Sequence, residues 1–255
     1  MPWDPAIYLQ FGAERSRPAA DLLARVPNEK PARVVDLGCG PGNSTALLTA
    51  CWPEARVTGV DSSVEMIEAA NAANVDAEFV VGDFESWEPA AAPDVIYANA
   101  AFQWSPDPVA LVRRMFAHLA PGGVLAFQVP QNFDQPSHVV MREVATNGPW
   151  AEKLDGARWY DPGGFARGPD YARALQRARR DIWTTDYLHI LKGPDPVFRW
   201  MAGTGLRPFL DRLEGGEREA FEDEVMTRFA AAYPLEKDGS TFFPFRRLFV
   251  VAARN

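Results

Sequence analysis

The chain contains only two cysteines, Cys39 and Cys51. Their spacing fits neither a disulfide framework nor a metal-binding CxxC pair, so we expect a reducing compartment, the cytoplasm, and no metal site. Cys39 lies between two glycines, where a small side chain suits a turn. We favour that role for Cys39 over a reactive thiol.

Long apolar runs and an excess of positive charge are also missing. No stretch of about 18 apolar residues occurs, and residues 1–5 lack a basic segment followed by an apolar core. The formal net charge of -8 gives no general attraction to phosphate backbones or anionic membranes. We therefore expect no export, no membrane span and no nucleic-acid partner. A monomer or weak homo-oligomer is also expected, although these features do not determine it.

The size and composition are those of an ordinary globular protein. A chain of 255 residues and 28.2 kDa can bury a full core. Its apolar and charged fractions of 47% and 24% are usual for this class. The length favours a single α/β domain over residues 1–255, with an insertion, rather than two independent domains.

Residues 34–42 consist of an apolar run and three alternate glycines, Gly38, Gly40 and Gly42. The run is typical of a strand buried on both faces of a parallel sheet. The glycines permit a sharp turn and the close approach of a ligand, although a tight turn without a ligand is an alternative for this motif alone. Ser44 or Thr45 is expected to cap the next helix, whose N-terminus favours an anionic or polar group.

An acidic residue follows the next expected strand, at residues 56–60. Asp61 stands where a carboxylate can accept hydrogen bonds from both hydroxyls of a ribose. The alternative role for Asp61 is a helix cap, which Ser62 or Ser63 would fill equally well. We favour ribose binding.

Asp83 and Phe84 follow a third expected strand, at residues 77–81. Asp83 can accept a hydrogen bond from an exocyclic amine, and Phe84 offers an apolar surface to a purine ring. Because the carboxyl ends of parallel strands meet at one edge of a sheet, this pair, Asp61 and the glycines together fit an adenosine.

Strands and helices alternate through the first 130 residues. Further strands are expected at residues 94–98 and 124–129, and helices at residues 13–26, 43–52, 64–73 and 109–119. This alternation predicts a doubly wound parallel sheet with right-handed crossovers.

The alternation ends at residue 130. Helices are expected at residues 139–150, 171–180, 196–213 and 217–233, and strands at residues 180–191 and 242–253, with the last two strands antiparallel. The predicted fold class is therefore α/β: a doubly wound, Rossmann-like, seven-stranded and mostly parallel sheet with an antiparallel C-terminal strand. Residues 130–180 and 193–237 are expected to cover the substrate as a helical lid insertion.

Taken together, these features resemble the class I S-adenosylmethionine-dependent methyltransferases, whose glycine motif is similar to residues 34–42. The resemblance covers the whole chain in order, including the C-terminal strand pair. It implies S-adenosyl-L-methionine as the cofactor and S-adenosyl-L-homocysteine as the product. The residues that it assigns to the cofactor are Asp36, Gly38, Gly40, Gly42, Asp61, Ser62, Met66, Asp83, Phe84 and Asn99.

A narrower resemblance is to the branch of this superfamily that methylates small carboxylic acids. It depends on residues 3–5, 8, 11, 15–18, 99–104 and 245–249. It implies an O-methyltransferase that forms a mono-methyl ester of a small polycarboxylate. The candidate residues for binding the acid are Tyr8, Arg17, Gln103, Trp104, His138, Tyr160, Tyr187, Arg246 and Arg247. Arg17 and His138, like Arg158, are weaker candidates than Arg246 and Arg247, and Trp159 is expected only to shape the pocket wall with the other aromatic residues.

A carboxylate acceptor determines the expected mechanism. With a reference pKa of about 4 it is ionised at neutral pH, so no general base is required and no catalytic residue is assigned. Catalysis is expected to come from proximity and orientation. Arg246 and Arg247 are the first candidates to bind the carboxyl groups that do not react, and adjacent strand residues point to opposite faces, so only one should reach the pocket.

Other functions fit less well or stay open. A dinucleotide dehydrogenase favours GxGxxG over the GxGxG spacing found here. Tyr233 and Lys237 match the spacing of short-chain dehydrogenases, but Pro234 indicates that a helix ends there. Residues 99–102 depart from the pattern of the N-methylating branch. A methyltransferase for another acid, such as a carrier-bound malonyl group, and a non-catalytic cofactor-binding protein remain alternatives.

Overall fold

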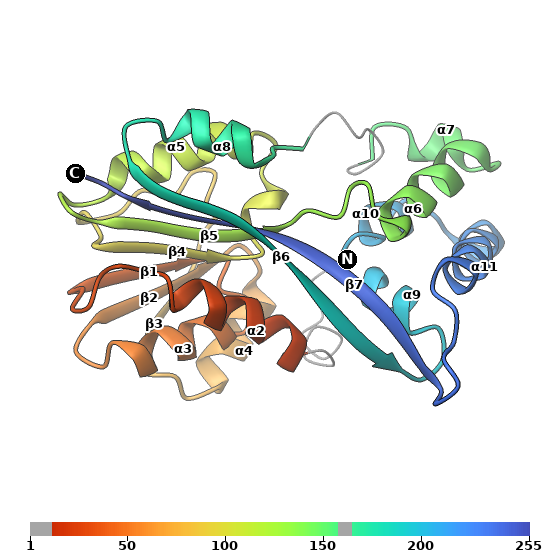
Figure 1. Cartoon of the computed structure of the whole chain (residues 1–255), viewed down its shortest axis with the longest axis horizontal. Coiled ribbons are helices and arrows are strands. Elements are labelled where there is room, and N and C mark those ends of the chain that lie inside the picture. Colours follow the sequence, from red (N-terminus) through yellow and green to blue (C-terminus); the bar gives the residue numbers. More distant parts are fainter. Residues whose placement is uncertain (1–11, 158–164) are drawn as a thin grey trace. The chain divides into compact units, whose positions relative to one another are not determined.

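The structure is a computed structural model, and it describes residues 12–157 and 165–255, with side chains from Ser16 onward (Figure 1). The chain divides into two compact units, which are described separately. The larger unit comprises the described residues of Pro2–Pro130, Ala166–Thr185 and Arg247–Asn255. The smaller unit comprises those of Gln131–Phe165 and Asp186–Arg246.

A seven-stranded sheet in the described residues has the strand order β3-β2-β1-β4-β5-β7-β6. Its strands are β1 Arg33–Leu37, β2 Arg56–Asp61, β3 Glu78–Val81, β4 Val95–Asn99, β5 Val124–Pro130, β6 Arg179–Lys192 and β7 Ser240–Ala253. Neighbours among β1 to β5 pair in parallel, and β7 runs antiparallel to β5. The predicted fold class is confirmed.

Helices cover both faces of the sheet in the larger unit. They are α2 Gly12–Leu23, α3 Asn43–Cys51, α4 Val64–Ala72, the short η1 Phe102–Trp104, α5 Pro108–His118 and α8 Gly168–Ala174. Figure 1 shows α2, α3 and α4 on one side of the strands and α5 and α8 on the other. Because both faces are covered, the central strands are apolar, and Leu37, Ile96 and Phe127 are fully buried.

Side-chain caps fix some of the helix starts near the sheet edge. Ser63 Oγ accepts a hydrogen bond from Met66 N at the start of α4, and Asp107 caps α5 in the same way. The prediction that Ser44 or Thr45 caps α3 is wrong. The cap position of α3 is Gly42, which has no side chain to offer, and both hydroxyls instead bond to Asp36.

Aromatic side chains form the core of the smaller unit. Its helices are α6 Pro136–Asn147, α7 Ala151–Leu154, α9 Pro196–Ala202, α10 Arg207–Leu210 and α11 Gly215–Ala232. The ring of Trp200 lies 4.5 Å from that of His189 and 5.9 Å from that of Phe243, which buries a large apolar area. In the part of the chain that is described, no helix is both long and apolar enough to cross a membrane.

The predicted basic helix at residues 171–180 is wrong in its extent. Helix α8 covers Gly168–Ala174, and Arg179 already begins β6. Arg180 Nη1 donates to the carbonyl oxygens of Leu175 and Gln176. A side chain that satisfies the open carbonyls at the end of a helix ends it rather than extends it.

The single helix predicted at residues 196–213 is also wrong, because α9 and α10 are separated by a turn. Gly205 lies in that turn, and a Cβ on it would be 2.7 Å from Cε of Met201. Glycine therefore permits the close packing at the break, and Pro208 starts the second segment in its first turn.

Candidate functional site

The loops that follow β1, β2 and β3 are joined by hydrogen bonds at the carboxyl edge of the sheet. Gly38 N donates to Val60 O over 2.8 Å. Gly40 N donates to Asp61 Oδ2 over 2.9 Å, and Gly82 N donates to Asp61 O over 2.9 Å. These three loops therefore lie together, at the edge where ligands bind in open α/β sheets.

Gly38 and Gly40 serve different purposes in the first loop. Both have positive φ, 70° and 54°, a conformation that glycine adopts most easily. A Cβ on Gly38 would overlap the Cβ of Ala101, so Gly38 lets the loop after β4 come close. A Cβ on Gly40 would meet no atom of the described residues within 4 Å. Gly40 therefore borders open space that a ligand can enter.

Asp36 is a fully buried carboxylate directly before the glycine loop. Its Oδ2 accepts hydrogen bonds from Ser44 Oγ and Thr45 Oγ1, each of 2.7 Å. Burial raises the pKa of Asp36 from 3.8 to about 6, against the lowering effect of the two hydroxyls. Its Oδ1 accepts no hydrogen bond from any described residue. Asp36 therefore places a costly negative charge behind the loop.

Both oxygens of Asp61 bind backbone amides. Oδ2 accepts from Gly40 N, and Oδ1 accepts from Ser63 N over 2.9 Å. Each carboxylate oxygen has a second lone pair, so Asp61 fixes the glycine loop and still has capacity for ribose hydroxyls. The other two predicted residues nearby differ in exposure, since Ser62 is exposed and Met66 is buried.

Asp83 and Phe84 are held in the turn after β3. Asp83 Oδ1 accepts from Glu85 N over 2.9 Å. The ring of Phe84 lies edge-on to that of Phe102, with centroids 6.0 Å apart, and its carbonyl oxygen accepts from Arg114 Nη2 over 2.6 Å. The predicted adenine-binding pair is therefore fixed at the same edge as the other loops.

Asn99, at the end of β4, lines a small hollow beside the glycine loop. The other residues that line this hollow are Ser16, Ala19, Gly38, Cys39, Pro41, Asn43 and Ser44. Asn99 is half-buried, and Ala100 turns the chain with a φ of 56°. The structure thus brings Asn99 together with Gly38, as predicted for a cofactor site.

The sequence prediction missed Gln128, which connects two predicted residues. Its side chain is fully buried within β5. Oε1 accepts from Arg247 Nη1 over 3.1 Å, and Nε2 donates to Asn99 Oδ1 over 2.6 Å. The available signal was a polar residue inside an otherwise apolar strand, because buried polar side chains require partners.

Arg246 and Arg247 differ in their surroundings, as alternation along a strand predicts. Arg246 forms a bidentate pair with Asp186, with distances of 2.7 and 2.9 Å, and this bonding lowers the pKa of Asp186. The Arg246 side chain is 43% exposed, whereas Arg247 is 4% exposed. Arg247 is therefore the buried cation of the two.

Three other predicted substrate residues lie in the larger unit. Arg17 is exposed, and Gln103 and Trp104 are half-buried in η1. Gln103 Nε2 donates to Ala100 O, which places this side chain in the loop after β4. The predicted residues Tyr8 and Tyr160, and also Arg158 and Trp159, lie outside the described residues.

His138 and Tyr187 belong to the smaller unit. His138 is buried, and burial, followed by the charge of Arg142, lowers its pKa to about 3. The imidazole is therefore neutral at pH 7 and would bind a carboxylate only as a hydrogen-bond donor. Tyr187 is 2% exposed and stacks on His189 with ring centroids 6.4 Å apart.

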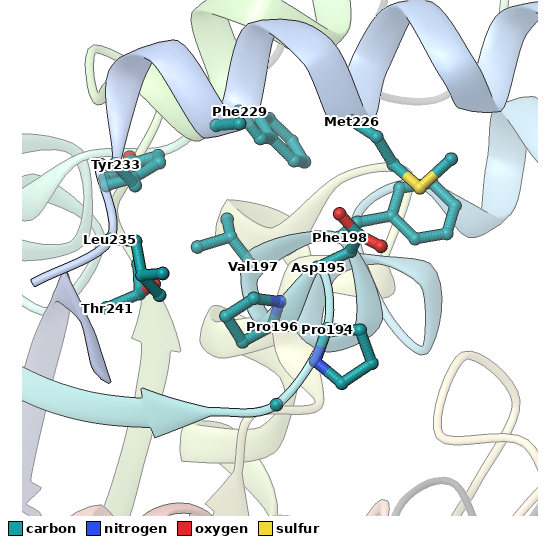
Figure 2. A pocket seen from close by; sticks show the side chains of 12 residues that line it. Pro194, Asp195, Pro196, Val197, Phe198, Met226, Phe229, Tyr233, Leu235 and Thr241 are labelled. Carbon is teal, nitrogen blue, oxygen red and sulfur yellow. The ribbon is translucent and has the colours of Figure 1, made fainter. Parts of the chain in front are cut away.

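A second hollow lies wholly within the smaller unit (Figure 2). It encloses about 640 Å³, including its open mouth. It is lined by Gly193, Pro194, Asp195, Pro196, Val197, Phe198, Met226, Phe229, Ala230, Tyr233, Leu235 and Thr241. Figure 2 shows mostly apolar side chains around it. None of the predicted site residues that the structure describes lines this hollow.

Cys39 has the properties of a structural thiol. It is 4% exposed, and burial, followed by the charges of Asp36 and Asp61, raises its pKa. A thiol that stays protonated is a poor nucleophile, in agreement with the predicted turn role. Over residues 12–157 and 165–255, no group of three or more His, Cys, Asp or Glu residues is placed to hold a metal ion.

The chain is similar to known methyltransferases over its full length. Residues 11–192 match a family model described as a methyltransferase domain. A relative from Azoarcus sp. named trans-aconitate 2-methyltransferase is 48% identical, with 99% of both chains covered. A relative of the same name from Variovorax paradoxus is 45% identical, with 100% of this chain and 99% of its own chain covered.

Solved structures share the fold at low sequence identity. YcgJ from Bacillus subtilis has a TM-score of 0.61 at 14% identity, with 94% of this chain and 98% of its own covered. A putative methyltransferase from Bacillus halodurans has a TM-score of 0.60 at 14% identity, with coverage of 92% and 98%. The family match confirms the predicted S-adenosylmethionine-dependent methyltransferase. The chain therefore belongs to the methyltransferase family, and relatives named trans-aconitate 2-methyltransferase match it along its full length.

Proposed function

We propose that this chain transfers the methyl group of S-adenosylmethionine to a carboxylate oxygen of trans-aconitate. The products are a mono-methyl ester and S-adenosylhomocysteine. The observation that carries the proposal is the 48% identity, over 99% of both chains, with a relative named for this reaction. A match of this extent includes the C-terminal strand with Arg246 and Arg247 as well as the glycine loop.

The described residues fit the cofactor. Gly40 borders open space, Asp61 has lone pairs left for ribose hydroxyls, and Asn99 lines the hollow beside the glycine loop. When bound, S-adenosylmethionine supplies a methyl group on a positively charged sulfur. Asp36, whose pKa is about 6, is mostly ionised above pH 7, and its charge favours a cation in the nearby hollow.

The acid needs positioning rather than activation. Its carboxyl groups have reference pKa values of about 4, so they are ionised at neutral pH and require no general base. A carboxylate oxygen forms a bond to the methyl carbon while the carbon–sulfur bond breaks, and the sulfur keeps the electron pair. The protein contributes by holding the oxygen in line and excluding water.

Arg247 is the preferred cation for a carboxylate that does not react. Arg246 Nε and Nη2 both donate to Asp186, whereas Arg247 is buried and its Nη1 donates to Gln128. A guanidinium in a buried setting interacts more strongly with a carboxylate than an exposed one does. Arg17, Gln103 and Trp104 are weaker candidates.

The covering role of residues 130–180 and 193–237 stays a prediction. Residues 166–180 belong to the larger unit and residues 131–165 to the smaller one, so the first segment is divided between them. A cytoplasmic location is likewise retained as a proposal, on the basis of the cysteine content, and a monomer or weak homo-oligomer stays a prediction.

Release of S-adenosylhomocysteine against a panel of acceptors tests the proposal. The panel contains trans-aconitate, other small di- and tricarboxylates, a carrier-bound malonyl group, a phenol and an amine. We expect turnover with trans-aconitate and a methyl ester as the product. Turnover confined to phenols or amines would refute the substrate. Product only with the malonyl carrier would favour that alternative, and cofactor binding without any product would favour a non-catalytic protein.

A further inference from the structure

A continuous chain of side-chain hydrogen bonds crosses the larger unit beside the glycine loop. Arg247 Nη1 donates to Gln128 Oε1 over 3.1 Å. Gln128 Nε2 donates to Asn99 Oδ1 over 2.6 Å. Gln128 has no exposed surface, so both ends of its amide are used inside the protein and neither competes with solvent.

The chemistry of these groups fixes the direction of every bond in the chain. A guanidinium has donors and no acceptor, so the amide of Gln128 must present its oxygen to Arg247. Its NH₂ group is then directed to Asn99, and Asn99 must accept with its oxygen. The group that remains on Asn99 is its own NH₂, for which no described residue acts as an acceptor. Asn99 lines the hollow together with Gly38 and Ser44.

We propose that Gln128 is a positioning residue. Its bond to Arg247 fixes the orientation of its own amide, which in turn fixes the orientation of the Asn99 amide, so that Asn99 offers an N–H donor rather than a carbonyl to the ligand in that hollow. The inference rests on the proposed function insofar as the ligand is the methyl donor. The group recognised is a hydrogen-bond acceptor on that ligand. Without Gln128 the amide of Asn99 would be free to turn, and half of its orientations would present an oxygen.

Packing alone does not account for a glutamine at this position. Phe127 and Val129, the strand neighbours of Gln128, are buried and apolar, and a leucine or methionine has a similar volume. A buried amide costs free energy unless all of its hydrogen bonds are made. Here Oε1 and Nε2 each have a partner, and both partners are side chains of the candidate site rather than backbone groups of the sheet.

Gln128→Glu reverses the polarity while keeping the shape. The new carboxylate accepts from Arg247 as before, but it has no N–H to donate, so Asn99 must turn and donate to it. An oxygen then faces the hollow. We expect the affinity for S-adenosylhomocysteine, measured by titration calorimetry, to fall about tenfold, the value of one hydrogen bond. Gln176→Glu, which adds the same charge at an exposed position of the same unit, should change it less than about twofold.

A double-mutant cycle separates this role from a purely structural one. In an Asn99→Ala background, Gln128→Glu should lose less than about twofold in affinity, because the group through which it acts is missing. In the native background it should raise KM for S-adenosylmethionine about tenfold and change kcat less, as expected for a bond made in both ground and transition states. Equal losses of affinity in both backgrounds would overturn the proposal, as would unchanged affinity of a folded Gln128→Glu variant.

Arg247→Met tests the same hydrogen bonds from the arginine end if Gln128→Glu does not fold. Removing the guanidinium lets the amide of Gln128 turn, so the affinity for S-adenosylhomocysteine should fall about two- to fivefold, and Asn99→Ala should abolish this effect. Unchanged affinity of a folded Arg247→Met variant would overturn the proposed role of Gln128. Wild-type protein that binds S-adenosylhomocysteine without esterifying trans-aconitate would instead overturn the proposed substrate, and these affinities would still decide the role of Gln128.

Discussion

Replacing Asp36 with asparagine should make the ligand-free protein more stable and the cofactor complex weaker. Asp36 is fully buried, and burial raises its pKa from 3.8 to about 6. Asparagine keeps an oxygen that accepts from Ser44 and Thr45, the two donors that Asp36 now uses. The substitution therefore removes the buried charge and puts an NH₂ group in the place of Oδ1, which has no hydrogen-bond partner among the described residues.

The size and sign of the stability effect follow from linkage. A pKa that is about 6 in the folded chain and 3.8 in a free carboxyl means that ionised Asp36 costs about 3 kcal/mol of folding free energy. Below pH 3.8 the carboxyl is protonated in both states and this cost is absent. As the pH rises through about 6 the cost becomes fully present. Asparagine has no such dependence.

Thermal unfolding of both proteins from pH 4 to pH 8 measures this effect. The difference in melting temperature should be near zero at pH 4, grow through pH 6 and reach about 6–12 °C in favour of Asp36→Asn at pH 8. Using the difference removes the contributions of all other carboxylates. An advantage that does not depend on pH, or a variant less stable at pH 8 than the native protein, would refute the reasoning.

The cofactor should respond in the opposite direction. Loss of the negative charge behind the glycine loop should weaken binding of S-adenosylmethionine, whose sulfur is positively charged, at least tenfold at pH 8. Asp94→Asn is the matched control, because Asp94 Oδ2 accepts from Ala32 N and Arg33 N at the opposite end of β1. It should leave the affinity unchanged. Equal weakening by both variants would indicate a general effect on the sheet.

Two paired substitutions give further predictions. Gly38→Ala should cost about 2–4 kcal/mol of stability, because its Cβ overlaps Ala101 at a positive φ. Gly40→Ala should cost about 1–2 kcal/mol of stability but weaken S-adenosylhomocysteine binding at least tenfold. Melting curves and calorimetry separate the two effects, and equal losses of stability would contradict the assignment. Arg247→Ala should raise KM for trans-aconitate about 10- to 100-fold, and Arg246→Ala less than about threefold, because Asp186 already neutralises Arg246. Steady-state kinetics measure both, and equal effects would remove the distinction between them.

The edge of the sheet that carries the site could be predicted because strand order and chain direction leave little freedom. In a doubly wound sheet the residues after β1, β2 and β3 must meet at one edge. Asp61 was identified by its place after an apolar run, and in the structure it bonds to Gly40 and stands beside Gly82. The apolar runs and the alternation of strands and helices were sufficient for this.

The details that the sequence did not reveal depend on side chains that choose between two partners. Ser44 and Thr45 are the second and third residues of α3 rather than its cap, and their hydroxyls donate to Asp36, because a hydrogen bond to a charged carboxylate is stronger than one between neutral groups. Gln128 stands in an apolar strand, and its partners are separated from it by 29 and 119 residues. Contacts at such separations have no local pattern.

Helix ends were mispredicted for a related reason. The basic residues near residue 180 suggested a continuous helix, but Arg180 donates to the carbonyl oxygens of Leu175 and Gln176. Whether an arginine extends a helix or closes it depends on where its guanidinium turns. That choice is made by the sheet that β6 joins, and not by the segment itself.

The two cysteines differ in exposure, so that one of them can be labelled selectively. Cys39 is buried, and its raised pKa leaves almost no thiolate, whereas Cys51 is exposed at the end of α3. A maleimide dye should therefore attach to Cys51 alone in the native chain, without any engineered substitution. Because α3 begins at the glycine loop, such a dye reports on ligand binding from the far end of the helix that the loop starts.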